Sequence, residues 1–162
     1  MRPLFGSWRY ERLRRMNPRA AAATLDEESP DALLRAYILE DDPDVAALEA
    51  DLLRDLGYTV VSCRRIVELG DLIQLGLPHL LVIDATLPDG DGADITALLL
   101  DAWPGIPVVI VSAAPVERLN ALRAIGPVVA KPFAIDDFRR AVLGAVEMPR
   151  GQAPGAIAPG SR

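Results

Sequence analysis

The sequence predicts an α/β fold, a doubly wound, five-stranded parallel sheet with helices on both faces. Five short apolar runs alternate along the chain with segments of helical periodicity, which is the order typical of β-α units. The apolar runs are continuous in Val, Ile and Leu and do not alternate with polar residues, as expected of strands that helices cover on both faces. Such units, connected right-handedly, build a doubly wound sheet.

The first β-α unit carries the clearest signals. Residues 36–39 (AYIL) are a candidate buried strand. Asp42 and Pro43 then give an N-cap and a first-turn signal, and Gly57 ends the helical pattern. The apolar residues at helical spacing between them are Val45, Leu48, Leu52 and Leu56, the pattern of a buried stripe.

The remaining units follow the same order. The other predicted strands lie at residues 58–62, 79–84, 106–112 and 127–130. The other predicted helices are an amphipathic segment ending near Leu75, residues 93–102 after the loop TLPDGDG, a weaker helix at 116–124, and a last helix with Ile135, Phe138, Val142 and Ala145 on one face.

Length and composition indicate one domain with two tails. A chain of 162 residues, 51% hydrophobic, has material for one sizeable core. We expect a disordered, arginine-rich leader at residues 1–32, the folded domain at 33–147 and a disordered Gly/Pro-rich tail at 148–162. The short tail predicts no output domain after the fold.

Charge and cysteine usage exclude several classes of protein. A net charge of -6 gives no footprint for nucleic acid, and no apolar run is long enough to span a membrane. The single cysteine, Cys63, rules out an internal disulfide and fits a reducing compartment, so we expect a cytoplasmic protein. Cys63 lies in an apolar run and is predicted to pack in the core, and the only histidine, His79, is predicted to be structural.

Polar side chains lie at the ends of four of the five predicted strands. The first strand ends on Glu40, Asp41 and Asp42, the third on Asp84, the fourth on Ser112 and the fifth on Lys131, the only lysine of the chain. Ligands of open α/β sheets bind outside the carboxyl ends of the strands, so these side chains are expected to meet at one edge. Each of them alone is commonplace, and the prediction depends on their order along the chain.

This set of side chains suits phosphoryl transfer. Carboxylates held close together repel, and a hard divalent ion with oxygen ligands, Mg²⁺, relieves the repulsion. A carboxylate at such a site is a nucleophile that forms an acyl phosphate. The metal, the lysine and the serine hydroxyl would neutralise and hydrogen-bond the equatorial phosphoryl oxygens.

The motifs YILEDDPD, LLVIDATLPDGDG, IPVVIVSA and VVAKPF resemble those of a response-regulator receiver domain, the phospho-accepting half of two-component signalling. The resemblance runs from Arg35 to Val146 and implies a flavodoxin-like strand order, 2-1-3-4-5. By resemblance, Asp84 is the phosphorylated residue, and Ser112 and Lys131 contact the phosphoryl group. The implied metal ligands are Asp41, Asp84, Glu40 acting largely through water, and the backbone carbonyl of Thr86. The Lys131–Pro132 peptide is expected to be cis.

The resemblance further implies a signalling protein that assists only its own Mg²⁺-dependent phosphorylation and dephosphorylation and is not otherwise an enzyme. Its partners would be a histidine kinase or histidine phosphotransfer protein, docking beside Asp84 on the first helix, and a downstream protein target, with no nucleic acid and no membrane. With no output domain expected, the chain resembles a stand-alone receiver in a phosphorelay.

Two features depart from the family pattern. Val128 stands where the family often has an aromatic residue, so switching by an aromatic rotamer is not expected. The segment between Ser112 and Lys131 is shorter than usual by roughly one helical turn. We therefore expect a truncated or irregular fourth helix.

Two alternatives stay open at this stage. A binding module with the same fold could keep these residues without ever carrying phosphate. A haloacid-dehalogenase-like phosphatase would also place an aspartate nucleophile, Asp84, at a strand end. Its general acid would be a second aspartate two positions further on, and that position is Thr86.

Overall fold

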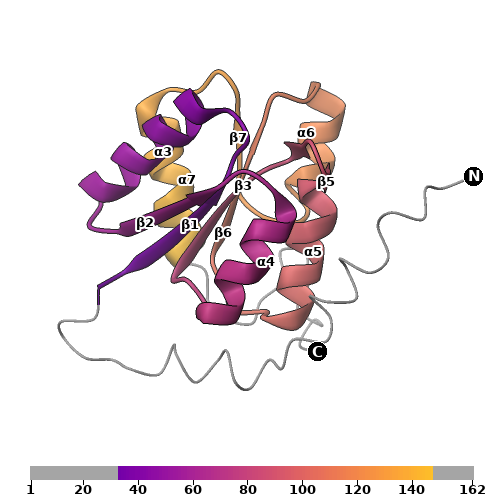
Figure 1. Ribbon diagram of the computed structural model, residues 1–162. Helices are drawn as coiled ribbons and strands as arrows, with labels where there is room; N and C mark the ends of the chain where they lie inside the picture. Colours follow the sequence, from indigo (N-terminus) through magenta and orange to yellow (C-terminus); the bar gives the residue numbers. More distant parts are fainter. Residues whose placement is uncertain (1–32, 148–162) are drawn as a thin grey trace, which may run out of the picture.

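The computed structural model of the chain describes residues 33–147 (Figure 1). The predicted leader at 1–32 and the predicted tail at 148–162 lie outside the described residues.

A parallel sheet of five strands forms the centre of the molecule. Its strand order is β2-β1-β3-β6-β7, which is the predicted order for the five strands of the β-α units. The strands are β1 (Arg35–Leu39), β2 (Thr59–Cys63), β3 (Leu80–Asp84), β6 (Val108–Ser112) and β7 (Val128–Ala130). All four strand pairs are parallel, so the predicted fold class is confirmed.

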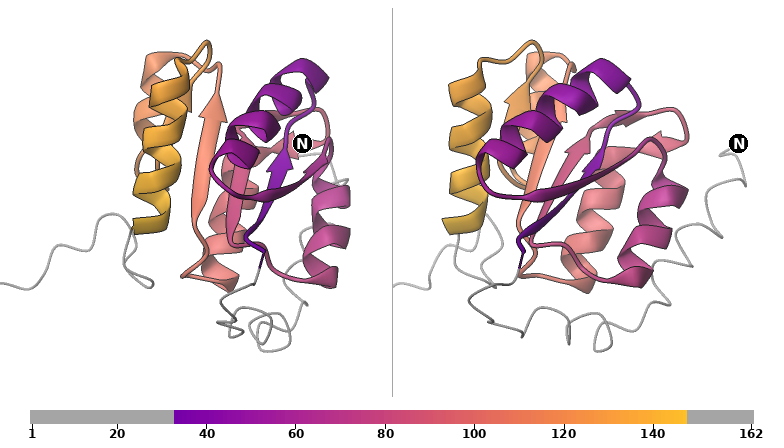
Figure 2. Two further views of the ribbon diagram at one scale, coloured as in Figure 1. Left: turned by 90° about the vertical axis from the view of Figure 1, so that its left-hand side faces the viewer. Right: turned by 60° about the vertical axis from the view of Figure 1, so that its left-hand side comes forward.

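Helices cover both faces of this sheet, and each face has its own core. The helices are α3 (Pro43–Asp55), α4 (Ile66–Leu75), α5 (Gly92–Ala102), α6 (Val116–Leu122) and α7 (Ile135–Glu147). One core joins the sheet to α3 and α7, and the other joins it to α4, α5 and α6 (Figures 1 and 2). In the part of the chain that the structure describes, no helix is long and apolar enough to cross a membrane.

The centre and the edge of the sheet differ in burial. Every residue of β3 and β6 is buried. In β2, however, Thr59, Val61 and Ser62 are exposed, because β2 is an edge strand and helices do not cover its whole length. The expectation that helices bury both faces of every strand is therefore wrong for β2.

The ends of α3 are as predicted, but its buried stripe is only partly so. Leu52 is buried as predicted, whereas Val45 and Leu56 are half-buried. The Asp42 carboxylate caps the helix by accepting the backbone N–H of Asp44 and of Val45, and Gly57 follows in the left-handed region with a φ of 91°. Leu48, predicted to be in the stripe, is 44% exposed. The residues that α3 buries are Ala46, Glu49, Ala50, Leu52 and Leu53. Small alanines let the helix lie close to the sheet, and the resulting rotation by about one residue, roughly 100°, moves Leu48 outward and Glu49 inward.

One loop and two helices differ in part from what the sequence predicts. The loop TLPDGDG contains a short antiparallel hairpin, β4 (Thr86–Leu87) with β5 (Gly90–Asp91). The helix expected at 116–124 is shorter, ending at Leu122, in line with the short segment around it. In α7, Phe138, Val142 and Ala145 are buried as predicted, whereas Ile135 is exposed because it begins the helix.

Cys63 and His79 have the structural positions that the sequence predicts. Cys63 is buried, and its thiol donates a hydrogen bond to the Ile38 carbonyl (3.3 Å). Burial raises the pKa of this thiol to about 12, so it stays protonated. His79 accepts the backbone N–H of Arg35 at Nδ1 (2.9 Å), which links the starts of β1 and β3.

Candidate functional site

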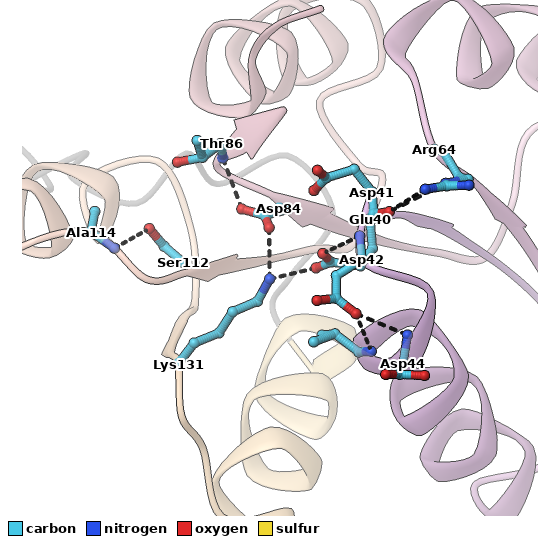
Figure 3. A network of polar contacts seen from close by, with 11 residues as sticks. Glu40, Asp41, Asp42, Asp44, Arg64, Asp84, Thr86, Ser112, Ala114 and Lys131 are labelled. Atoms are coloured by element: carbon cyan, nitrogen blue, oxygen red, sulfur yellow. Dashed lines mark hydrogen bonds and ion pairs between the residues drawn. The ribbon is translucent and has the colours of Figure 1, made fainter. Parts of the chain in front are cut away.

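The candidate site lies at the carboxyl ends of the parallel strands, the end toward which the strand arrows point in Figure 2. The strand register places Asp84 opposite Val111, and Ser112 opposite Ala130. Ser112 and Lys131 therefore follow at the same edge as Asp84, where Figure 3 shows them with Glu40 and Asp41. Four strand ends thus contribute to one site.

Lys131 joins two strand ends through two short ion pairs. Its Nζ lies 2.6 Å from Oε2 of Glu40 and 2.6 Å from Oδ2 of Asp84 (Figure 3). Burial alone would lower the pKa of Lys131, but the hydrogen bonds and charges of Asp84 and Glu40 outweigh burial and raise the pKa. Lys131 is therefore an ammonium at neutral pH. The Lys131–Pro132 peptide is cis, as expected.

Glu40 is almost completely buried, with 1% of its surface exposed. Its Oε1 accepts the backbone N–H of Asp42 (3.1 Å), while Oε2 binds Lys131. Burial raises the pKa of Glu40, and the negative charge of Asp84 acts in the same direction. The hydrogen bonds from Lys131 and Asp42 act against this rise. Glu40 is thus an acid whose charge depends on its cationic partner.

Asp84, at the end of β3, is held on both oxygens. Oδ1 accepts the backbone N–H of Thr86 (2.8 Å), and Oδ2 binds Lys131. The side chain of Thr86 is exposed beside it. The role of the Thr86 backbone carbonyl as a metal ligand stays a prediction.

Gly92, which the sequence analysis did not select, lies directly against Asp84. A Cβ atom at position 92 would come within 1.9 Å of the Asp84 backbone oxygen, so only glycine fits here. The Gly92 N–H donates to the Ala85 carbonyl (3.0 Å), which brings the start of α5 back onto the end of β3. The glycine-rich run DGDG was the available signal, but a run of this kind does not say which glycine meets the backbone of another segment.

The three acids form a set of oxygen ligands. Each of Glu40, Asp41 and Asp84 offers a carboxylate oxygen, and these oxygens all lie within 4.8 Å of one another. Lys131 supplies one ammonium against these carboxylates, so the group keeps an excess of negative charge. A hard divalent cation with oxygen ligands fits such a donor set.

Ser112 is buried at the end of β6 with none of its surface exposed. Its Oγ accepts the backbone N–H of Ala114 (3.1 Å), which leaves the hydroxyl hydrogen for another acceptor. Among the described residues, no hydrogen bond joins this hydroxyl to Asp84 or Lys131. Ser112 is therefore placed at the site edge, and its contact with a phosphoryl group stays a prediction.

Arg64 also reaches the site and was missed by the sequence analysis. Its guanidinium donates two hydrogen bonds to the backbone carbonyl of Asp41, from Nε (3.2 Å) and from Nη2 (3.0 Å) (Figure 3). Arg64 follows directly on β2, so the rule of strand ends would have selected it.

The chain belongs to the response regulator receiver domain family, whose model matches residues 36–143. Receiver domains of this family are signalling phospho-acceptors that take the phosphoryl group from histidine kinases. Family membership does not support the phosphatase alternative.

Individual curated relatives share low sequence identity with this chain. The probable transcriptional regulatory protein TcrX of Mycobacterium tuberculosis is 29% identical over 103 residues, which is 62% of this chain and 44% of the relative. The chain thus aligns with less than half the length of this curated relative.

Solved structures share the fold. The signal receiver domain of an HD domain-containing protein from Pseudomonas fluorescens is 19% identical, with a TM-score of 0.66 over 75% of this chain and 93% of that one. The response regulator TrrA from Thermotoga maritima, solved in complex with Mg²⁺-BeF, is 18% identical, with a TM-score of 0.62 over 68% of this chain and 97% of that one.

Proposed function

We propose that this domain accepts a phosphoryl group on Asp84 from a histidine kinase or a histidine phosphotransfer protein, as one step of two-component signal transduction. The observation that carries the proposal is the Lys131 ammonium, 2.6 Å from both Glu40 and Asp84, beside three carboxylates that converge within 4.8 Å. A buried nucleophile, a fixed cation and a set of metal ligands are the parts that phosphoryl transfer requires.

In the proposed step, an Asp84 carboxylate oxygen forms a bond to phosphorus while the P–N bond of the donor phosphohistidine breaks. The imidazole nitrogen keeps the electron pair of the broken bond. The product is an acyl phosphate on Asp84, whose new negative charge lies beside Lys131 and the backbone N–H of Thr86. The Ser112 hydroxyl, whose oxygen accepts the Ala114 N–H and whose hydrogen is not used in that bond, would donate to a phosphoryl oxygen.

We assign Mg²⁺ to the three acids, with Asp41 and Asp84 as direct carboxylate ligands, Glu40 acting through water and the Thr86 backbone carbonyl completing the protein's share. When bound, the ion would neutralise charge on the phosphoryl oxygens. The residues suit this ion because all their contacting atoms are oxygens and because the carboxylates outnumber the Lys131 ammonium.

We place the phosphodonor on the exposed side of α3, next to the site. Asp44, Ala47 and Asp51 are exposed there, and Leu48, which the rotation of α3 turns outward, adds an apolar side chain between them. Substitutions of Asp44, Ala47 and Asp51 that left the rate of phosphotransfer unchanged would argue against this face.

The compartment of this reaction is proposed to be the cytoplasm. The chain has one cysteine, which is buried and free, and this fits a reducing compartment.

The proposal is tested by incubating the protein with acetyl phosphate and Mg²⁺ and measuring the intact mass. We expect the wild type to gain one phosphoryl group and Asp84→Asn to gain none. Asp94→Asn, which changes an exposed carboxylate in the first turn of α5, is the control and should be phosphorylated like the wild type.

Three results would contradict the proposal. An adduct on Asp84→Asn would remove Asp84 from its role. An unmodified wild type would favour a binding module that does not carry phosphate, whereas continuous turnover of a phosphomonoester would favour a phosphatase.

A further inference from the structure

Asp41 differs from the other two acids of the site in how its carboxylate is held. Glu40 and Asp84 each accept one backbone N–H, and they share the Lys131 ammonium. Within residues 33–147, no hydrogen bond reaches the Asp41 carboxylate. Its position therefore depends on the conformation of its own backbone, in the turn between β1 and α3.

Arg64 is hydrogen-bonded to that backbone. Its guanidinium donates from Nε and Nη2 to the Asp41 carbonyl, at 3.2 and 3.0 Å (Figure 3). The ladder between β1 and β2 pairs Leu39 with Cys63, and Arg64 is the next residue. The two hydrogen bonds thus extend the link between these strands beyond their ends and into the turn that carries the acid.

The start of α4 holds Arg64 in turn. The backbone N–H of Arg64 donates to Oε2 of Glu68 (2.8 Å), while Oε1 of Glu68 binds Arg65 (3.0 Å). The hydrogen bond from the Arg64 backbone is the main cause that lowers the pKa of Glu68, so this carboxylate is ionised at neutral pH. Asp41 is thereby connected to a helix end through Arg64.

We infer that Arg64 is a positioning residue, which holds the Asp41 turn so that its carboxylate faces the cation site. This inference rests on the function proposed above. A planar guanidinium donates two N–H groups in a fixed geometry, which a lysine cannot reproduce. The geometry of Arg64 favours cation binding, whereas its positive charge disfavours it by repelling a bound cation. Substitutions can therefore separate the effect of geometry from that of charge.

The test is the Mg²⁺ dissociation constant of the full chain, measured by isothermal titration calorimetry without a phosphodonor. Loss of a residue that orients a metal ligand typically weakens binding by 10- to 100-fold, and we expect about tenfold for Arg64→Gln. Arg64→Lys should be weakened similarly although it keeps the charge. The matched control is Arg65→Gln, which removes the neighbouring arginine and a contact to the same Glu68 but no contact to Asp41, and it should bind Mg²⁺ like the wild type.

A double substitution separates positioning from a general effect on the fold. In the background of Asp41→Asn, the substitution Arg64→Gln should cause almost no further loss of Mg²⁺ affinity, because the carboxylate that it positions is gone. The inference is overturned if Arg64→Gln binds Mg²⁺ as well as or more tightly than the wild type. It is also overturned if Arg65→Gln loses as much, or if the loss persists in full without the Asp41 carboxylate. A wild type that binds no Mg²⁺ would instead remove the proposed metal site itself.

Discussion

Glu49 allows a quantitative test of how α3 packs. The residue lies in the buried stripe of α3 with none of its surface exposed, and neither carboxylate oxygen has a hydrogen-bond partner among the described residues. The pKa of Glu49 is raised from 4.5 to about 8, and burial is the main cause. The negative charges of Glu40 and Asp84 add to the rise, and Lys131 opposes it. Glu49 is therefore a neutral acid at pH 7 in the folded protein.

The direction of the pH effect follows from this shift. The folded pKa lies above the unfolded value, so between pH 4.5 and about pH 8 folding takes up a proton that the unfolded chain has released. The free energy of unfolding falls as the pH rises through this range, by roughly 1.4 kcal/mol per pH unit. Between pH 4.5 and pH 7 the loss is on the order of 3 kcal/mol, and above about pH 8 it stops growing.

The measurement compares the wild type with Glu49→Gln by urea unfolding across this pH range. The amide cannot ionise, so the pH-dependent loss should be absent from the variant. The variant should be more stable than the wild type at pH 7 by up to about 3 kcal/mol. The two proteins share every other titrating group, including His79, so the difference between their free energies of unfolding isolates Glu49. Parallel curves for the two proteins would refute the argument, because Glu49 would then be solvated or paired in solution.

Three further predictions concern the site and its supports. Lys131→Met leaves the buried Glu40 carboxylate without its cation and should lower the free energy of unfolding by about 2 to 3 kcal/mol, and Mg²⁺ should restore part of this loss. Urea unfolding with and without Mg²⁺ checks it, and a fully stable variant would contradict it. Gly92→Ala forces a Cβ to within 1.9 Å of the Asp84 backbone oxygen, so it should cost about 2 kcal/mol or more and reduce labelling by acetyl phosphate. Wild-type labelling and melting temperature would contradict the close contact. Asp42→Ala removes the N-cap of α3 and should cost about 1 kcal/mol, seen as a lower urea midpoint, whereas an unchanged midpoint would exclude a capping role.

The fold was readable from the sequence because its signals are local. Continuous apolar runs marked the central strands, and Asp42, Pro43 and Gly57 marked the ends of α3. The edge position of β2 was not readable from composition, since TVVSC is as rich in β-branched residues as strands that are fully buried. Burial of a strand depends on its neighbours in the sheet, which no run of residues specifies alone.

In the candidate site, too, some features follow from the sequence and others depend on the fold. A strand end is a position along the chain, and parallel topology brings all such positions to one edge. For that reason Glu40, Asp84 and Lys131 could be expected together, and the structure places them in contact. Their roles in phosphoryl transfer remain predictions.

The residues that sequence reasoning missed owe their importance to contacts with distant segments of the chain. Glu49 is buried because the packing of α3 fixes its rotation, and the spacing of Val45 and Leu48 had indicated a rotation about one residue away. Gly92 matters because the chain returns from the β4–β5 hairpin onto the Asp84 backbone, and Arg64 because a long side chain crosses from the end of β2 to the end of β1. Each of these contacts joins two segments. The position of Arg64 after a strand is visible in the sequence, but its contact with Asp41 requires coordinates, as do the contacts of Glu49 and Gly92. Substitutions at these positions therefore test the packing around the site, whereas substitution of Asp84 tests its chemistry.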